Sequence, residues 1–282
     1  MNLDLTKINL SIEGSNKKKI TLDITLPISK VKTPVVIFCH GFKGFKDWGH
    51  FNWISNAFAK QGLAFLKFNF SYNGTTEKQL IDLSDLEAFG NNNYQIEYDD
   101  LGLVIDYVEK ECIAFHINKN EIYLAAHSRG GGIAILRTSE DKRIKKLALW
   151  ASLSEFESFF RPETIKKWQA DGAVYATNKR TNQELPLYKQ FYDNYIENKS
   201  KLDVPKAALL ISAPMLIIHG DNDEAVNISH AEALYEIVQH SIFIKVENGD
   251  HTFGAKHPFN EATDVTEMLE ELVENTVEFF ID

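Results

Sequence analysis

Six short, largely apolar runs, separated by segments of helical periodicity, constrain the fold of this chain more than any other feature. The first run is rich in β-branched residues, which is typical of a strand buried on both faces. Strands that alternate with helices are joined by crossovers, so the sequence predicts an α/β fold with a mainly parallel sheet of about eight strands flanked by helices. The runs are VVIFCHG (35–41), LAFLKFNF (63–70), EIYLAAH (121–127), IKKLALWAS (144–152), APMLIIHG (213–220) and SIFIKVEN (241–248).

The segments around these runs complete the expected sheet and its covering helices. The first 26 residues alternate polar and apolar positions around Gly14-Ser15-Asn16, which favours an antiparallel hairpin at one edge of the sheet. Apolar positions at helical spacing predict helices between the strands. These helices are expected over 48–61, 96–111, 131–139, 228–240 and 262–280.

Residues 153–205 break this rhythm, because they are too long for one crossover helix. A long insertion after a strand is a usual place for a lid, so we expect an α/β core formed by 1–152 and 206–282, with an inserted helical cap at 153–205. The cap is rich in aromatic residues. We expect about half of them to pack the cap's own core and others, with Trp168 and Tyr175 as candidates, to face a substrate. The aromatic residues are Phe156, Phe159, Phe160, Trp168, Tyr175, Tyr188, Phe191, Tyr192 and Tyr195.

Composition narrows the classes of partner and compartment. The formal net charge of −10 argues against nucleic acid or anionic lipid as the main partner. Cys39 and Cys112 are too few for a disulfide framework, which favours a reducing compartment, and we expect a cytoplasmic protein. MNLDLTKINL lacks the pattern of a signal peptide, and no apolar stretch approaches the ~20 residues of a membrane span. No metal-ligand spacing or nucleotide-binding motif occurs, so we expect no metal and no cofactor.

Polar side chains follow several of the predicted strands at the point where each strand ends. Ser128 follows one strand, residues 219–223 (HGDND) follow another, and residues 248–251 (NGDH) follow the last. Residues 40–42 (HGF) follow the first of the six. Because active sites in open parallel sheets form outside the carboxyl ends of the strands, we expect a hydroxyl, a carboxylate and an imidazole to meet at this edge.

The stretch Ala126-His127-Ser128-Arg129-Gly130 resembles a nucleophile elbow of the form G-x-S-x-G, with alanine in the first glycine place. Small residues are needed there because the serine lies on a sharp strand-to-helix turn with strained backbone angles. Two further glycines follow, and the stretch stands between a predicted strand and a predicted helix. We therefore interpret Ser128 as a catalytic nucleophile.

A serine nucleophile needs a base, and the base needs a carboxylate to orient it. We predict His251, in GDHTF directly after the last strand, as the base; His257, which precedes Pro258, is its nearest rival. For the acid, Asp221 and Asp223 compete. The pattern H-G-x-x-D favours Asp223, while Asp221 is better suited to capping the turn.

Backbone N–H groups are suited to hold a developing oxyanion because they are rigid. We expect one from Arg129, the residue after the nucleophile, and one from Phe42 in the loop after the first parallel strand. His40 is expected to order that loop and to take no part in the chemistry.

Taken together, HGFKGFKDW, HSRGGG, HGDNDEAV and GDHTFG are similar to the motifs of the α/β-hydrolase superfamily, whose chain order is also Ser, Asp, His. Within it the chain resembles small intracellular carboxylesterases and the cinnamoyl or feruloyl esterases, which carry a cap between the strand after the nucleophile helix and the strand before the acid. Similar sequences are often described as dienelactone-hydrolase-like. Dienelactone hydrolases use a cysteine nucleophile, and Ser128 departs from that pattern.

This resemblance implies a serine hydrolase that cleaves a small-molecule carboxylic ester by two-step acyl transfer, with an apolar or aromatic group under the cap. A peptidase or amidase of the same fold is an alternative, for which Glu155, Glu157 or Glu163 would bind a free amino terminus. A binding protein that kept the fold without catalysis is another. The sequence leaves the oligomeric state open, including a homodimer.

Overall fold

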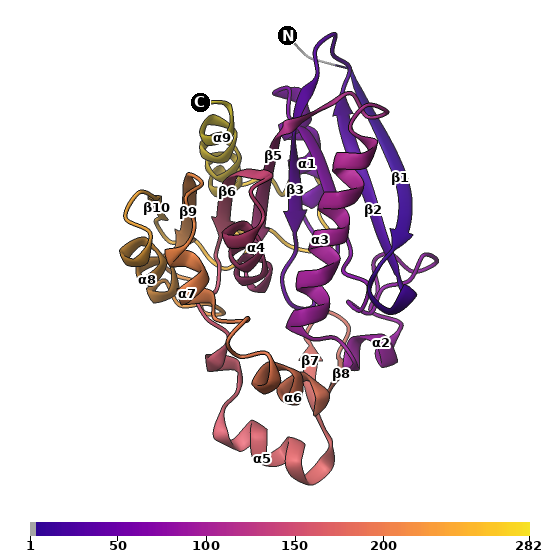
Figure 1. The fold of residues 1–282 in the computed structure, drawn as a ribbon, viewed down its shortest axis with the longest axis vertical. Coiled ribbons are helices and arrows are strands. Elements are labelled where there is room, and N and C mark those ends of the chain that lie inside the picture. Colours follow the sequence, from indigo (N-terminus) through magenta and orange to yellow (C-terminus); the bar gives the residue numbers. More distant parts are fainter. Residues whose placement is uncertain (1–3) are drawn as a thin grey trace.

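The computed structural model describes residues 4–282, which form one eight-stranded sheet with the strand order β1-β2-β4-β3-β5-β6-β9-β10 (Figure 1). β1 and β2 form the predicted antiparallel hairpin, and β2 pairs antiparallel with β4. All other pairs are parallel, which confirms the mainly parallel sheet. The strands are β1 (Leu5–Glu13), β2 (Lys19–Pro27), β3 (Thr33–Cys39), β4 (Ala64–Phe68), β5 (Ile117–His127), β6 (Ile144–Trp150), β9 (Met215–Gly220) and β10 (Ile242–Val246).

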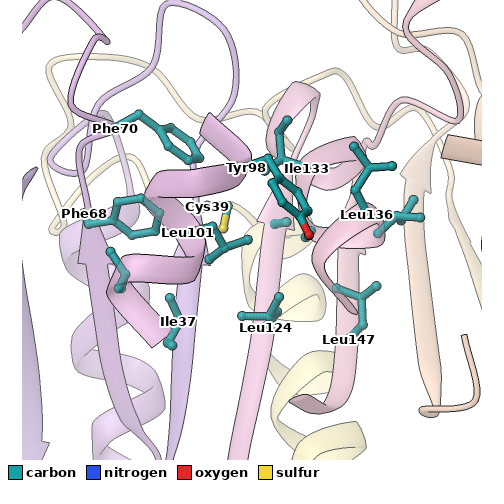
Figure 2. Close-up of a cluster of buried hydrophobic side chains, with 14 of the residues drawn as sticks. Ile37, Cys39, Phe68, Phe70, Tyr98, Leu101, Leu124, Ile133, Leu136 and Leu147 are labelled. Atoms are coloured by element: carbon teal, nitrogen blue, oxygen red, sulfur yellow. The ribbon is translucent and has the colours of Figure 1, made fainter. Parts of the chain in front are cut away.

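Helices cover both faces of the sheet, and a separate apolar cluster lies on each face. In β3, Ile37 and Cys39 belong to one cluster, while Val36 and Phe38 belong to the other, because successive side chains of a strand point to opposite faces. Figure 2 shows part of the first cluster, where β3 packs against Leu101 of α3. The core helices are α1 (Phe51–Lys60), α2 (Leu86–Gly90), α3 (Tyr94–Glu111), α4 (Arg129–Glu140), α7 (Val204–Leu209), α8 (Ser229–Ile237) and α9 (Glu267–Ile281).

The segment between β6 and β9 extends beyond the sheet, at the lower end of the molecule in Figure 1. It holds helices, as predicted, and also an antiparallel hairpin that the sequence analysis did not predict. The hairpin turn lies at 179–182, where Asn182 takes a φ of 55°. The elements are α5 (Pro162–Asp171), β7 (Ala173–Asn178), β8 (Gln183–Tyr188) and α6 (Gln190–Glu197).

Most aromatic side chains of this segment pack on one another and on the core. Trp168 is fully buried, and its indole N–H donates to the carbonyl oxygen of Leu187 at 2.7 Å. Phe156 stacks on Tyr94 of α3, with ring centroids 3.8 Å apart. Tyr175, in contrast, is 58% exposed to solvent. The buried aromatic residues, and Phe156 in particular, therefore anchor the segment to the core.

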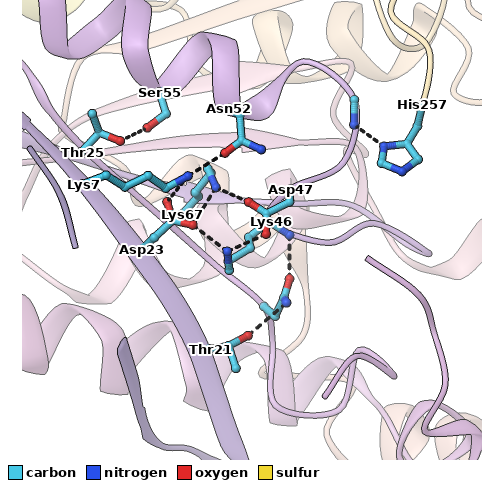
Figure 3. A network of polar contacts seen from close by, with 12 residues as sticks. Lys7, Thr21, Asp23, Thr25, Lys46, Asp47, Asn52, Ser55, Lys67 and His257 are labelled. Atoms are coloured by element: carbon cyan, nitrogen blue, oxygen red, sulfur yellow. Dashed lines mark hydrogen bonds and ion pairs between the residues drawn. The ribbon is translucent and has the colours of Figure 1, made fainter. Parts of the chain in front are cut away.

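A buried network of charges fixes the loop that follows β3 (Figure 3). The ammonium of Lys46 lies 2.6 Å from Asp23 of β2, and the ammonium of Lys67 of β4 lies 2.8 Å from the same oxygen. Asp47 contacts both lysines at 2.6 Å. Buried charges are tolerated only when they are paired, so the four residues hold the loop against the sheet.

Within residues 4–282, no helix is both long and apolar enough to cross a membrane. The same residues contain no cluster of three or more histidine, cysteine, aspartate or glutamate side chains arranged to hold a metal ion. Cys39 and Cys112 are both buried and free.

Candidate active site

Ser128 lies at the turn between β5 and α4, in a backbone conformation that is rare for a residue with a side chain. Its φ is 57° and its ψ is −124°. The turn is held because the N–H of Ser128 donates to the carbonyl oxygen of Trp150 at 2.9 Å, and the N–H of Gly131 donates to the carbonyl oxygen of Ser128 at 2.9 Å. Strained conformations of this kind persist only where the surroundings hold them, and they concentrate at functional sites.

The glycines after Ser128 are required by close packing at the start of α4. A Cβ atom on Gly130 would lie 2.6 Å from the carbonyl oxygens of both Cys39 and His40. A Cβ atom on Gly131 would lie 2.0 Å from the hydroxyl of Ser152. The helix thus begins in contact with the end of β3 and with the segment after β6, and only glycine fits at these positions.

The structure brings the hydroxyl of Ser128 and the two predicted partner side chains into one hydrogen-bonded line. Nε2 of His251 lies 3.0 Å from Oγ of Ser128. Nδ1 of the same ring lies 2.7 Å from Oδ2 of Asp223. The three residues follow β5, β9 and β10, so the carboxyl ends of three parallel strands position them.

Asp223 is held as a carboxylate at this site. Its side chain is fully buried, and Oδ1 accepts the N–H groups of Ala225 and Val226, each at 2.8 Å. Nε2 of His219 lies 3.3 Å from Oδ2. Burial alone would raise the pKa of Asp223, but hydrogen bonds from His219 and His251 outweigh it and hold the pKa well below its ordinary value.

Asp221 and His257, the alternative candidates for the acid and the base, form hydrogen bonds to other groups. Asp221 accepts the N–H of Asn248 at 2.7 Å and joins the loops after β9 and β10. Nδ1 of His257 accepts the N–H of Gly49 at 2.9 Å. Neither side chain takes part in the line of hydrogen bonds that ends at Ser128.

His127, which the sequence analysis did not single out, contacts the backbone of the predicted base, His251. Its Nε2–H donates to the carbonyl oxygen of His251 at 2.8 Å, and the two rings lie 4.7 Å apart. Burial, with a smaller contribution from the charge of His251, lowers the pKa of His127 to about 3, so this ring is neutral near pH 7. The sequence feature that could have identified His127 is its position directly before Ser128 in the stretch Ala-His-Ser.

The loop after β3 lies directly against the serine. A Cβ atom on Gly41 would lie 2.8 Å from the Cβ of Ser128. His40 is buried, and its Nδ1–H donates to the carbonyl oxygen of Gly41 at 2.9 Å, as expected of a residue that orders this loop. Arg129 is the first residue of α4, so its N–H has no acceptor within the helix.

The side chain of Arg129 links α4 to two neighbouring elements. Its guanidinium is buried and forms an ion pair with Glu97 of α3. It also lies over the ring of Phe42, 4.6 Å from the centroid. The residue after the predicted nucleophile therefore helps to hold the loop that carries the second predicted oxyanion donor.

A cavity of about 270 Å³ opens beside Ser128 and His251. One wall is aromatic and comes from the loop after β3 and the start of α1, while a second wall comes from the end of β7 and the hairpin turn. Neither Trp168 nor Tyr175 lines this cavity, contrary to what the sequence suggested for the cap. The aromatic lining consists of Phe42, Phe45, Trp48 and Phe51, and the hairpin supplies Asn178, Lys179 and Arg180.

The sheet order, the strained serine turn and the loops at the carboxyl ends of the strands define an α/β-hydrolase fold. Residues 22–238 match the BD-FAE family model, and the chain belongs to this family.

Solved structures share the fold over nearly the whole chain. Est1E from Butyrivibrio proteoclasticus, with ferulic acid bound, superposes with a TM-score of 0.71 at 19% identity, covering 96% of this chain and 98% of that one. A putative hydrolase from Agrobacterium vitis S4 gives a TM-score of 0.73 at 15% identity, with 99% and 100% covered. A dienelactone hydrolase from Anabaena variabilis gives 0.64 at 17% identity, with 98% and 97% covered.

Among curated proteins, an uncharacterised 31.7 kDa protein in the traX-finO intergenic region of Escherichia coli is 32% identical over 127 residues. The match covers 45% of this chain and 40% of that relative, so the chain matches less than half of the relative's length.

Proposed function

We propose that this protein is a serine hydrolase that cleaves carboxylic esters. The observation that carries the proposal is the hydrogen-bonded line from Asp223 through His251 to the hydroxyl of Ser128. A serine is a weak nucleophile at its free pKa and becomes reactive beside a base that a third group orients.

The proposed reaction has two steps. Oγ of Ser128 attacks the ester carbonyl carbon while Nε2 of His251 accepts the hydroxyl proton, and the N–H groups of Phe42 and Arg129 stabilise the oxyanion. The C–O bond to the alcohol breaks, and the alcohol leaves with that proton. Water then attacks the acyl-enzyme with His251 again as the base, which releases the acid and restores Ser128.

The lining of the cavity supports an apolar or aromatic group next to the scissile bond. The rings of Phe42, Trp48 and Phe51 offer a surface for such a group. Est1E, which shares the fold, holds ferulic acid, an aromatic acid. We also propose that residues 153–205 act as a cap, since their hairpin turn supplies one wall of the cavity.

The peptidase alternative has less support. It calls for carboxylates near the serine to bind a free amino terminus, and Glu155, Glu157 and Glu163 do not line the cavity of Ser128. Glu157 instead forms an ion pair with Lys199.

A fluorophosphonate probe and a short-chain p-nitrophenyl ester test the proposal. The wild type should react with the probe and hydrolyse the ester, and Ser128→Ala should do neither. Ser158→Ala, which removes an exposed hydroxyl from the insertion, is the matched control and should behave as the wild type. Equal labelling of Ser128→Ala, or ester turnover no faster than background, would contradict the proposed function.

A further inference from the structure

The charged side chains that line the cavity of Ser128 are all cationic. They are Lys43, from the loop after β3, and Lys179 and Arg180, from the hairpin turn; among the described residues, 4–282, no carboxylate side chain lines the cavity. This is unexpected in a chain with 40 acidic and 30 basic residues. The groove between α1 and α9, in contrast, has the excess of acidic over basic side chains that the whole chain has: it is lined by four glutamates and one lysine.

Two of these cations carry uncompensated charge. Arg180 is paired with Asp82 at 3.1 Å, but within residues 4–282 neither Lys43 nor Lys179 forms an ion pair with a carboxylate. Lys43 donates to a neutral acceptor, the carbonyl oxygen of Thr177, at 3.3 Å, and its ammonium lies over the ring of Phe42, 5.6 Å from the centroid.

Lys43 and Lys179 line the same cavity. Burial, and then the charge of Lys179, lower the pKa of Lys43 below its ordinary value. An anion bound in this cavity would offset the positive charge and replace the interaction with water that burial removes. The arrangement thus favours a negatively charged occupant over a neutral one of the same shape.

We propose that the ester substrate carries a carboxylate, which binds at Lys43 and Lys179 while the scissile carbonyl lies at Ser128. The inference rests on the proposed function and narrows its substrate class to anionic esters. The aromatic wall contacts the apolar part of the substrate. The hairpin turn and the loop after β3 together bind its carboxylate.

Matched esters test this inference. The pairs are 3- and 4-butyryloxybenzoate against the corresponding benzamides, and a 4-nitrophenyl adipate monoester against its adipamate, so that the carboxylate lies on either side of the scissile bond. We expect kcat/KM to favour the anionic member of at least one pair by about tenfold or more. The preference should fall as ionic strength rises from about 0.01 M to about 1 M, where the Debye length shortens from about 30 Å to about 3 Å.

The anionic-to-neutral ratio is also the readout for the variants, because it cancels changes that affect both esters equally. Lys43→Gln and Lys179→Gln should each lower the ratio several-fold, and the double variant should bring it close to one. Lys119→Gln, which removes an exposed lysine from β5, is the matched control and should keep the wild-type ratio. A wild-type ratio near one in every pair, with clear turnover of the neutral esters, would overturn the inference while leaving the esterase proposal intact.

A binding measurement keeps the inference testable if no ester is turned over. Ser128→Ala should bind benzoate more tightly than benzamide in ligand-observed NMR, and adding Lys179→Gln should remove that difference. Absence of turnover, together with selective benzoate binding, would contradict the esterase proposal and support the anion site. Equal binding of benzoate and benzamide would contradict the anion site.

Discussion

Asp221 and Asp223 are separated by one residue but have different partners, and this difference can be measured. We expect Asp223→Asn to lower kcat/KM for a p-nitrophenyl ester by about 10³- to 10⁴-fold, because the ring of His251 loses the charge that stabilises its protonated form. Asp221→Asn keeps a side-chain oxygen that can accept the N–H of Asn248, and should cost less than about tenfold. Steady-state kinetics on both variants decide the matter, and a larger loss for Asp221→Asn would mean that the acid is wrongly assigned.

His127 acts through the backbone of His251, so we regard it as a positioning residue. His127→Phe removes the donor to that carbonyl and should lower kcat about tenfold with little change in KM, because a displaced base costs the chemical step more than binding. His127→Gln, which keeps an N–H donor, should recover part of the loss. An effect of His127→Phe on KM alone, or no rescue by glutamine, would argue against this role.

At the scale of elements, the start of α4 shows why a glycine run stands after the serine. Gly130→Ala places a methyl group against two backbone carbonyls that cannot rotate away, and should lower the free energy of unfolding by about 3 kcal/mol. Gly62→Ala is the control: its φ is 87° and a Cβ there meets nothing within 4 Å, so we expect only the conformational cost of about 1–2 kcal/mol. Urea unfolding of both variants compares these costs, and an equal loss would remove the packing argument.

The elements that the sequence predicts well are those with a buried, largely apolar pattern. The six predicted strands all occur, because burial on both faces leaves a strong signal. β7 and β8 were missed since the hairpin lies at the surface and mixes buried with exposed positions. β5 begins at Ile117, earlier than the apolar run, because Ile117 pairs with Thr33.

The candidate site could be predicted in part. Ser128, Asp223 and His251 each follow a strand, so parallel topology and the resemblance to α/β-hydrolases place them at one edge. The ion pair of Arg129 with Glu97 could not be found this way, since it depends on how α3 packs beside α4. The basic hairpin turn was missed for the same reason. It lines the cavity of Ser128 through tertiary packing, which the spacing of residues along the sequence does not reveal.

At the scale of the whole molecule, the buried charge network makes the free energy of unfolding depend on pH in the acidic range. Burial opposes ionisation of Asp47, but Lys67 and Lys46 outweigh it and lower its pKa from 3.8 to about 2. The carboxylate therefore stabilises the fold by about 1–2 kcal/mol above pH 4, and this contribution is lost as pH falls toward 2.

Asp47→Asn should be less stable than the wild type near pH 7, and the difference should shrink between about pH 4 and pH 2. Chemical denaturation across that range measures it. A difference that stays constant down to pH 2 would mean that the pKa of Asp47 is not depressed.

Of the four tryptophans, Trp48 lies in the aromatic wall of the cavity, Trp53 lines the groove between α1 and α9, and Trp150 and Trp168 are fully buried. The fluorescence of Trp48 should therefore change when a ligand binds in the cavity. Binding can then be followed without a dye or a chromogenic ester. A screen of unlabelled compounds becomes practical on this basis, with Trp48→Phe as the silent reference.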